Sequence, residues 1–158
     1  MRTISILLAA ALAGCTAVTV KPAAWTPDVP RTICVKKNAT IVDPDLLPAV
    51  EAALRRSGLA FTVYEGPAYT AEPAETLAPP QTFPSTCDYV LTYSGTMWWD
   101  LAMYLNHAEF RIQDRSYREV GFATWHLKGH GGFDLGKYSS TDSKVAPVLA
   151  ELLGGVPS

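Results

Sequence analysis

The sequence predicts a two-layer α+β sandwich, in which a mixed, mostly antiparallel sheet carries two helices on one face. Two apolar stretches with helical spacing, near residues 45–57 and 143–153, indicate the helices. Short segments rich in alternating or β-branched residues indicate five strands. The predicted order along the chain is β-α-β-β-β-β-α, which places the helices in one layer and the strands in the other.

The first strand, first helix and second strand follow one another closely. Residues 31–36 alternate in polarity, which is typical of a strand. Asp45 is a good N-cap, and it places Pro48 in the first helical turn, where a missing N–H costs nothing. Gly58 favours the end of the helix, and residues 59–64 then form the second predicted strand.

A proline-rich stretch follows and cannot form regular structure. Residues 66–85 contain five prolines, each of which lacks a backbone N–H donor. A structureless stretch of this length is unusual inside a compact domain, so we expect a surface excursion or a functional loop. With both helices on one face of the sheet, the other face meets water unless this loop or a partner covers it.

The second half of the chain is predicted to be three strands and a helix. Residues 88–97, 103–113 and 119–127 have strand character, with a turn at Trp98-Trp99-Asp100 between the first two. Ser143 is the predicted N-cap of the last helix, which has Pro147 near its first turn. Residues 31–158 are therefore expected to form a single domain.

The last two strands place several polar side chains on one face of the sheet. This interpretation assumes that Arg115 and Ser116 form a two-residue hairpin loop. A loop of different length parity would reverse the assignment of faces. The cross-strand pairs predicted on the face away from the helices are His107 with Thr124, Glu109 with Phe122, and Arg111 with Val120.

The polar face supports two alternatives. His107, Glu109 and the nearby His126 could bind zinc or another divalent metal, or act as acid and base, in a metal-dependent or hydrolytic enzyme. Alternatively, these residues and Arg111 form an ordinary solvated face of alternating charge, because the sequence has no ligand spacing such as HExxH.

Trp98 and Trp99 are the most prominent candidates for a contact surface. Adjacent strand residues point to opposite faces, so both tryptophans cannot be buried in one core. Exposed aromatics serve contacts with proteins, membrane surfaces or sugars, so a glycan or peptidoglycan binder is a further alternative. Packing beneath the proline-rich loop, which holds Tyr69 and Phe83, is equally consistent with the sequence.

The N-terminus carries a targeting signal. The tetrad Leu12-Ala13-Gly14-Cys15 follows an apolar run that is far shorter than the ~20 residues needed to span a membrane. It resembles a lipobox, the processing signal of bacterial lipoproteins. This resemblance implies that residues 1–14 are removed, that Cys15 carries acyl chains such as palmitate, and that Thr16 directs transfer to the outer membrane. Residues 15–30 contain three prolines and are predicted to be a tether.

Two cysteines remain after the lipid anchor. The oxidising environment outside the cytoplasm favours a disulfide between Cys34 and Cys87. A metal site and two free thiols are the alternatives, but Cys34 has no cysteine or histidine near it in sequence. The disulfide would attach the end of the proline-rich loop to the first predicted strand.

Composition and short motifs argue against several classes of function. The formal charge is −2 and no basic stripe is present, so nucleic-acid binding is unsupported. The sequence has no GxSxG element. The glycine-rich residues 129–132 lack the Lys-Ser/Thr ending of a phosphate loop, so they are interpreted as a turn, with His130 as a loop residue.

Further motifs resemble a family of small proteobacterial lipoproteins of unknown function. They are Ile33-Cys34-Val35-Lys36, the run CDYVLTY from Cys87, and Trp99-Asp100 with His107-Ala108-Glu109 after it. The resemblance spans most of the mature chain and implies no activity. We therefore expect a non-enzymatic accessory or binding protein, lipid-anchored on the periplasmic face of the outer membrane, with an envelope protein as partner and no cofactor beyond its lipid.

Overall fold

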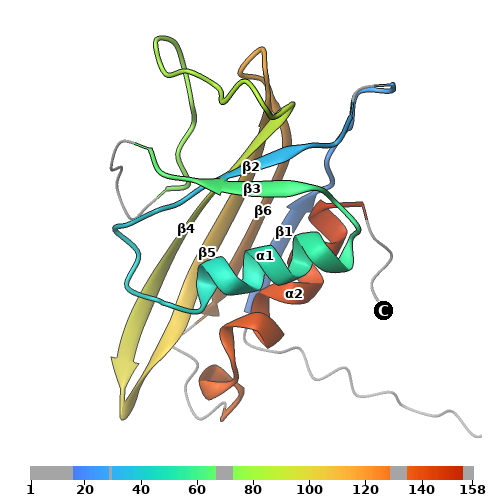
Figure 1. The fold of residues 1–158 in the computed structure, drawn as a ribbon. Helices are drawn as coiled ribbons and strands as arrows, with labels where there is room; N and C mark the ends of the chain where they lie inside the picture. The colour runs from blue at the N-terminus through green and yellow to red at the C-terminus, as the bar shows by residue number, and fades with distance from the viewer. Residues whose placement is uncertain (1–15, 29, 67–72, 129–134, 155–158) are drawn as a thin grey trace, which may run out of the picture.

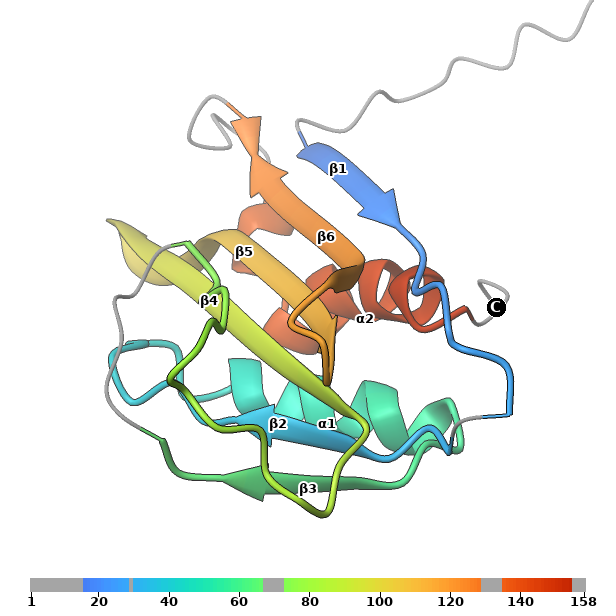
Figure 2. The same cartoon turned by 90° about the horizontal axis from the view of Figure 1, so that it is seen from above.

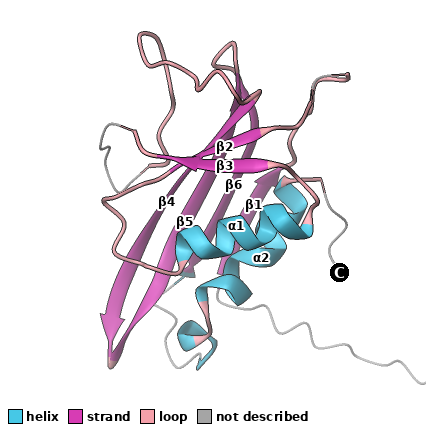
Figure 3. Cartoon of the chain, in the orientation of Figure 1, coloured by secondary structure: helices cyan, strands magenta, loops and turns pink. Residues whose placement is uncertain are grey.

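The computed structural model describes residues 16–28, 30–66, 73–128 and 135–154 and shows an α+β protein (Figure 1, Figure 3). A six-stranded mixed sheet has the order β1-β6-β5-β4-β2-β3, in which β2 is parallel to both neighbours and the other pairs are antiparallel. Its elements are β1 (Thr16–Lys21), β2 (Ile33–Lys36), α1 (Leu46–Arg56), β3 (Phe61–Tyr64), β4 (Tyr89–Asp100), β5 (Ala102–Asp114), β6 (Glu119–Leu127), the 3-10 turn η2 (Leu135–Tyr138) and α2 (Thr141–Leu152).

The segment expected as a tether, residues 15–30, contains the extra strand β1. Residues 16–21 pair antiparallel with β6 at the edge of the sheet. The backbone then stays on the domain, because Ala23 N–H donates to the carbonyl of Leu152 at 2.8 Å. The prolines of this segment all follow β1, so its alternating β-branched run is free to extend the sheet. The element order therefore begins with one strand more than predicted.

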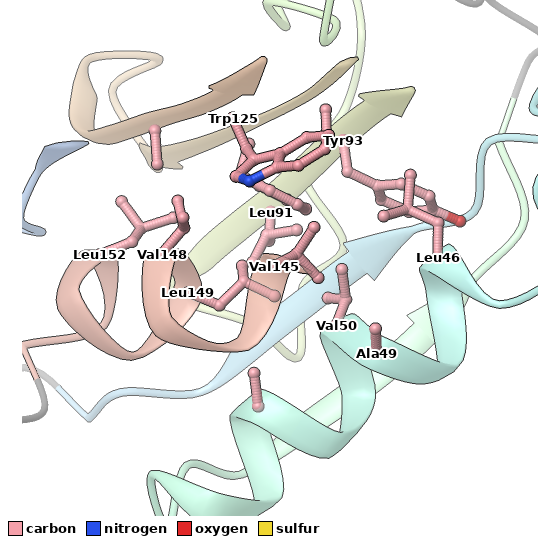
Figure 4. Packing of buried hydrophobic residues seen from close by; sticks show 14 of the residues in the cluster. Leu46, Ala49, Val50, Leu91, Tyr93, Trp125, Val145, Val148, Leu149 and Leu152 are labelled. Carbon is pink, nitrogen blue, oxygen red and sulfur yellow. The ribbon is translucent and has the colours of Figure 1, made fainter. Parts of the chain in front are cut away.

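Both helices pack side by side on one face of the sheet (Figure 2). Their apolar stripes meet Leu91 and Tyr93 of β4 and Trp125 of β6 (Figure 4). Burial of each large side chain contributes roughly 1.5–3 kcal/mol, so this layer supplies most of the core. The helix residues shown in it are Leu46, Ala49 and Val50 of α1 and Val145, Val148, Leu149 and Leu152 of α2.

The helix starts differ in detail from the prediction. Asp45 occupies the N-cap of α1, yet within the described residues its side chain makes no capping bond. Asp43 accepts the N–H of Asp45 at 2.9 Å and the hydroxyl of Thr141 at 2.7 Å, which ties the starts of the two helices together. Ser140, not Ser143, caps α2, so Pro147 lies in the second turn rather than the first.

The β4–β5 hairpin is longer than predicted. Trp98, Trp99 and Asp100 belong to β4 rather than to a turn, because each pairs with a residue of β5. The turn is reduced to Leu101, which has a left-handed φ of 63°. The sequence did not reveal this turn, because leucine is not a residue that favours this conformation.

The β5–β6 hairpin shifts the predicted register by two residues. One residue of the shift comes from the loop, which is longer than two residues and in which Asp114 accepts the backbone N–H groups of Ser116 and Arg118, at 2.8 and 3.1 Å. The other comes from a bulge between Ile112 and Gln113. The shift preserves parity, so the same side chains stay on the same faces. The observed pairs are His107 with His126, Glu109 with Thr124, and Arg111 with Phe122, in place of the predicted Thr124, Phe122 and Val120.

The proline-rich loop covers part of the second face of the sheet. The side chain of Gln113 accepts from Leu77 N–H at 2.7 Å and donates to the Leu77 carbonyl at 3.1 Å. Thr92 donates its hydroxyl proton to the carbonyl of Glu75 at 2.7 Å. The loop end is held by the predicted disulfide between Cys34 and Cys87, which is confirmed.

Asp114→Asn is expected to lower stability at neutral pH but not in acid. Burial alone would raise the pKa of Asp114, but hydrogen bonds from Arg118 and Ser116 outweigh it and hold the pKa below its ordinary 3.8. The stabilisation is therefore complete above that ordinary value and is lost as pH falls through the lowered one. Urea unfolding at several pH values should show a neutral-pH difference of about 1 kcal/mol that disappears in acid. A difference that persists in acid would contradict the role of the carboxylate charge.

Removal of the disulfide is expected to destabilise the whole domain. Cys34 and Cys87 are separated by 53 residues in sequence, a loop whose closure is worth about 4 kcal/mol in the chain-entropy model. Urea unfolding of the Cys34→Ala/Cys87→Ala variant should show this loss relative to the oxidised protein. A free-thiol assay on the unfolded, unreduced parent is the control, and two reactive thiols there would refute the pairing.

Candidate functional site

The end of the β4–β5 hairpin is the main exposed apolar surface among the described residues. Trp99 is 72% exposed and Leu101 is 85% exposed, values that are unusual for large apolar side chains. The turn η2 adds Leu135, which is 81% exposed. We call this surface the tip patch; it consists of Trp98, Trp99, Leu101, Met103, Leu135 and Tyr138.

Strand geometry explains why both tryptophans reach the surface. A bulge between Thr96 and Met97 shifts the pairing, so that Trp98 lies opposite Tyr104 and Trp99 opposite Met103. The two tryptophans therefore point to opposite faces of a ribbon that extends beyond the rest of the sheet (Figure 1). The described part of the proline-rich loop packs at the other end of β4, where Phe83 contacts Tyr117 at 5.3 Å between ring centroids.

Asp100 anchors the hairpin end to η2. Its carboxylate accepts a hydrogen bond from the Lys137 ammonium at 2.5 Å, and its backbone carbonyl accepts the hydroxyl of Tyr138. The hydrogen bond to Asp100 raises the pKa of Lys137, so the lysine stays charged and compensates the carboxylate. The acidic residue of the tip is thus a structural partner rather than a free anionic contact.

A second lysine joins η2 to the helix layer. Lys144 Nζ donates to the Lys137 carbonyl at 2.5 Å and lies 5.6 Å from the centre of the Trp125 ring. Burial lowers the pKa of Lys144. These contacts connect the tip, through η2, to the core beneath it.

On the predicted polar face the two histidines lie together, but the carboxylate of Glu109 binds Arg111 instead. The rings of His107 and His126 are 5.7 Å apart. Glu109 accepts from Arg111 at 2.9 Å, and Arg111 also binds Glu119. Across the parts of the chain that the structure describes, no group of three or more His, Cys, Asp or Glu could hold a metal ion. His130 lies outside the described residues.

A pocket that no sequence motif predicts lies beneath the proline-rich loop. It has a volume of about 500 Å³ and opens where β2 and β3 end. The sequence indicated that residues 66–85 could be a functional loop, but it did not indicate which residues of β2 and β3 face that loop. The lining residues are Lys36, Tyr64, Glu65, Gly66, Leu77, Pro80, Gln81, Thr82 and Pro84.

Comparisons with known proteins identify a similar fold. No family model matches the chain, and no curated protein matches it. A dodecamer of a PelC variant from Paraburkholderia phytofirmans is 18% identical, with a TM-score of 0.51, over 87% of this chain and 94% of that chain. A second PelC dodecamer from the same organism is 22% identical, with the same coverage and a TM-score of 0.47. At these identities the likeness concerns the fold alone.

Arg111→Met is expected to destabilise the protein, because the arginine is a structural partner of two carboxylates and packs 4.9 Å from the centre of the Phe122 ring. The substitution leaves the buried Glu109 unpaired, which should cost about 2 kcal/mol in urea unfolding at neutral pH. The double variant Glu109→Gln/Arg111→Met is the control and should recover part of the loss. Full stability of Arg111→Met would indicate instead that this side chain is kept for binding.

Proposed function

We propose that the protein is a lipid-anchored component of the cell envelope, attached to the outer membrane through Cys15 and oriented on it by the tip patch. In this proposal the chain is a non-enzymatic accessory or binding protein. Glu109 and Arg111 support that choice, because they bind each other at 2.9 Å in an ion pair.

The position of β1 carries the proposal. Cys15 lies outside the described residues, but the next residue, Thr16, pairs with Leu127 at the end of β6. His126 pairs with His107, so this end of β1 lies level with the start of the long hairpin ribbon. Leu101 lies five residues further along the ribbon, or about 17 Å at strand spacing. The start of β1 and the end of the β4–β5 hairpin therefore lie toward the same side of the molecule (Figure 1).

The composition of the tip suits the surface of a bilayer. Tryptophan is enriched where membrane meets water, because its ring is apolar and its N–H is polar. Apolar residues within the last few positions of the ribbon would reach about 5–10 Å into the interface, as surface-bound elements do. The charge of Asp100 is already compensated by Lys137, which reduces the cost of bringing it close to lipid.

The conformation of Leu101 also supports a contact at the tip. A left-handed φ costs a leucine roughly 1–2 kcal/mol, and glycine or asparagine would occupy this turn more easily. In water the leucine side chain is 85% exposed, so little apolar burial offsets that strain. Burial in lipid would return about 1.5–3 kcal/mol, which offsets the cost.

The acyl chains already suffice for attachment, so the tip is assigned an orienting role. Two or more chains bind a membrane stably, whereas a few interfacial side chains add orientation. Among the described residues, no helix has both the length and the apolar character needed to cross a membrane. With the ribbon seated on lipid, the rest of the domain faces the periplasm and an envelope protein partner. The dodecamer of the PelC variant is a precedent for assembly within this fold.

Vesicle binding by the mature chain with Cys15→Ser, which lacks the lipid, tests the role of the tip. Flotation with phosphatidylethanolamine–phosphatidylglycerol vesicles should show binding that falls at least about tenfold in Trp99→Ser/Leu101→Ser, since about 1.4 kcal/mol of burial is a factor of ten. Val42→Ser is the matched control, because Val42 is 73% exposed on the β2–α1 connection. Equal binding by the tip variant and the parent would reject the proposal.

The anchor itself is tested separately. The full chain, with its signal, should incorporate labelled palmitate and fractionate with outer membranes, and Cys15→Ala should lose both properties. Retention of the label in Cys15→Ala would refute lipidation at this residue.

A further inference from the structure

The pocket beneath the proline-rich loop lies at a special point of the topology. After β2 the chain passes to the helix face to form α1, whereas residues 73–88, which come after β3, lie over the opposite face (Figure 2). Two neighbouring parallel strands whose connections leave toward opposite faces open a crevice at their carboxyl ends, where ligands commonly bind. Lys36 and Tyr64, the last residues of β2 and β3, line this crevice.

A buried ion pair lies at the base of the pocket. The side chain of Lys36 is only 2% exposed, and its ammonium binds Glu75 at 2.5 Å. The amide of Gln81 donates to the other oxygen of the same carboxylate, also at 2.5 Å. The two charges compensate each other, and Glu65, the carboxylate in the pocket lining, pairs with Lys37 at 2.8 Å. The acidic groups at the pocket are therefore each paired with a lysine.

Gly66 gives the pocket access to this lysine. A Cβ atom at position 66 would lie 2.5 Å from Cε of Lys36, which is far inside van der Waals contact. A larger residue would require the Lys36 side chain to move. The absence of a side chain at Gly66 therefore leaves room for Lys36 at the base of the pocket.

The walls combine hydrogen-bonding groups with apolar surface. Burial and the nearby Glu75 raise the pKa of Tyr64 to about 12, so its hydroxyl keeps its proton and can both donate and accept. The hydroxyl of Thr82 can also both donate and accept, whereas the Gln81 amide already donates to Glu75 and accepts from Ala78 N–H. The apolar part comes from Leu77, Pro80 and Pro84.

These walls are held in place by contacts outside the pocket. The hydroxyl of Tyr117 donates to the carbonyl of Gln81 at 2.6 Å, and Arg115 donates to the carbonyl of Ser85 at 2.7 Å. Gln113 and the disulfide fix the two sides of the same loop segment. Such preorganisation removes much of the ordering cost that a ligand would otherwise meet.

We propose that this pocket binds a neutral saccharide of one or two rings. Its volume falls at the lower end of the range of about 300–1,000 Å³ for small-ligand sites. A sugar ring presents hydroxyls that donate and accept around its rim and C–H groups on its faces, which matches the mixed walls. A charged ligand would bring an uncompensated charge beside a pair that is already balanced, at a cost in desolvation. This site is independent of the membrane contact proposed above.

Nuclear magnetic resonance with defined sugars tests the site. The probes are diacetylchitobiose and maltose, with glucosamine and glucuronic acid as charged comparators, on the mature chain with Cys15→Ser. A neutral disaccharide should shift the amide signals of residues 64–66 and 81–82. Thr82→Trp, at the exposed rim, should weaken binding at least about tenfold, which corresponds to about 1.4 kcal/mol.

Ser85→Trp is the matched control, because Ser85 is exposed on the same loop but does not line the pocket. It should bind like the parent, and both variants should unfold at the parent's urea midpoint. Three results would overturn the proposal: no shifts with either neutral disaccharide, tighter binding of a charged comparator, or shifts confined to the indole signals of Trp98 and Trp99. The last result would move saccharide binding to the tip patch.

Discussion

The attachment of the proline-rich loop to the second face of the sheet is the constraint on which the architecture depends. Both helices lie on the first face, so the apolar and polar groups of β2 and β4 on the other side need another cover. Backbone groups of Leu77 and Glu75 bind Gln113 and Thr92, buried polar side chains of the sheet that need hydrogen-bond partners. A loop without regular structure can thus act as a third layer, because the sheet supplies the hydrogen bonds that the loop cannot make internally.

This cover is incomplete, and the uncovered parts have distinct properties. Over β5 and β6 the exposed face is filled by charges that bind each other, such as Arg111 with Glu109 and Glu119. At the hairpin end the surface is apolar and includes the strained Leu101. Charge pairs satisfy themselves in water, whereas exposed tryptophan and leucine do not. The same sheet therefore carries a face of paired charges and an apolar end that would gain stability from contact.

The sequence predicted the helices and strands that follow from local periodicity. It did not predict the features that depend on contacts between distant segments. The helices were predicted from the apolar stripes that contain Val50 and Val148. The core residues of β2 were predicted from the alternation of Ile33 and Val35, because both patterns are local. Residues 16–21 were missed as a strand because the prolines after them dominated the composition, and only pairing with β6 stabilises an edge strand of this kind. The register of His107 depended on the length of one hairpin loop and on a bulge between Ile112 and Gln113. The ion pair of Lys36 with Glu75 joins residues 39 apart, which no local pattern specifies.

The strand register also relates the two proposed contact sites to each other. Val35 pairs with Leu91, so Lys36 at the base of the pocket lies level with Thr92 of β4. Leu101 lies nine residues further along the same direction, or about 30 Å at strand spacing. With the tip seated on lipid and β1 joining Cys15 directly to the sheet, the pocket would be held at a fixed height above the membrane rather than on a flexible tether. A rigid spacing of this kind is useful to a protein that presents a binding site to the periplasm, because it limits which parts of the envelope the pocket can reach.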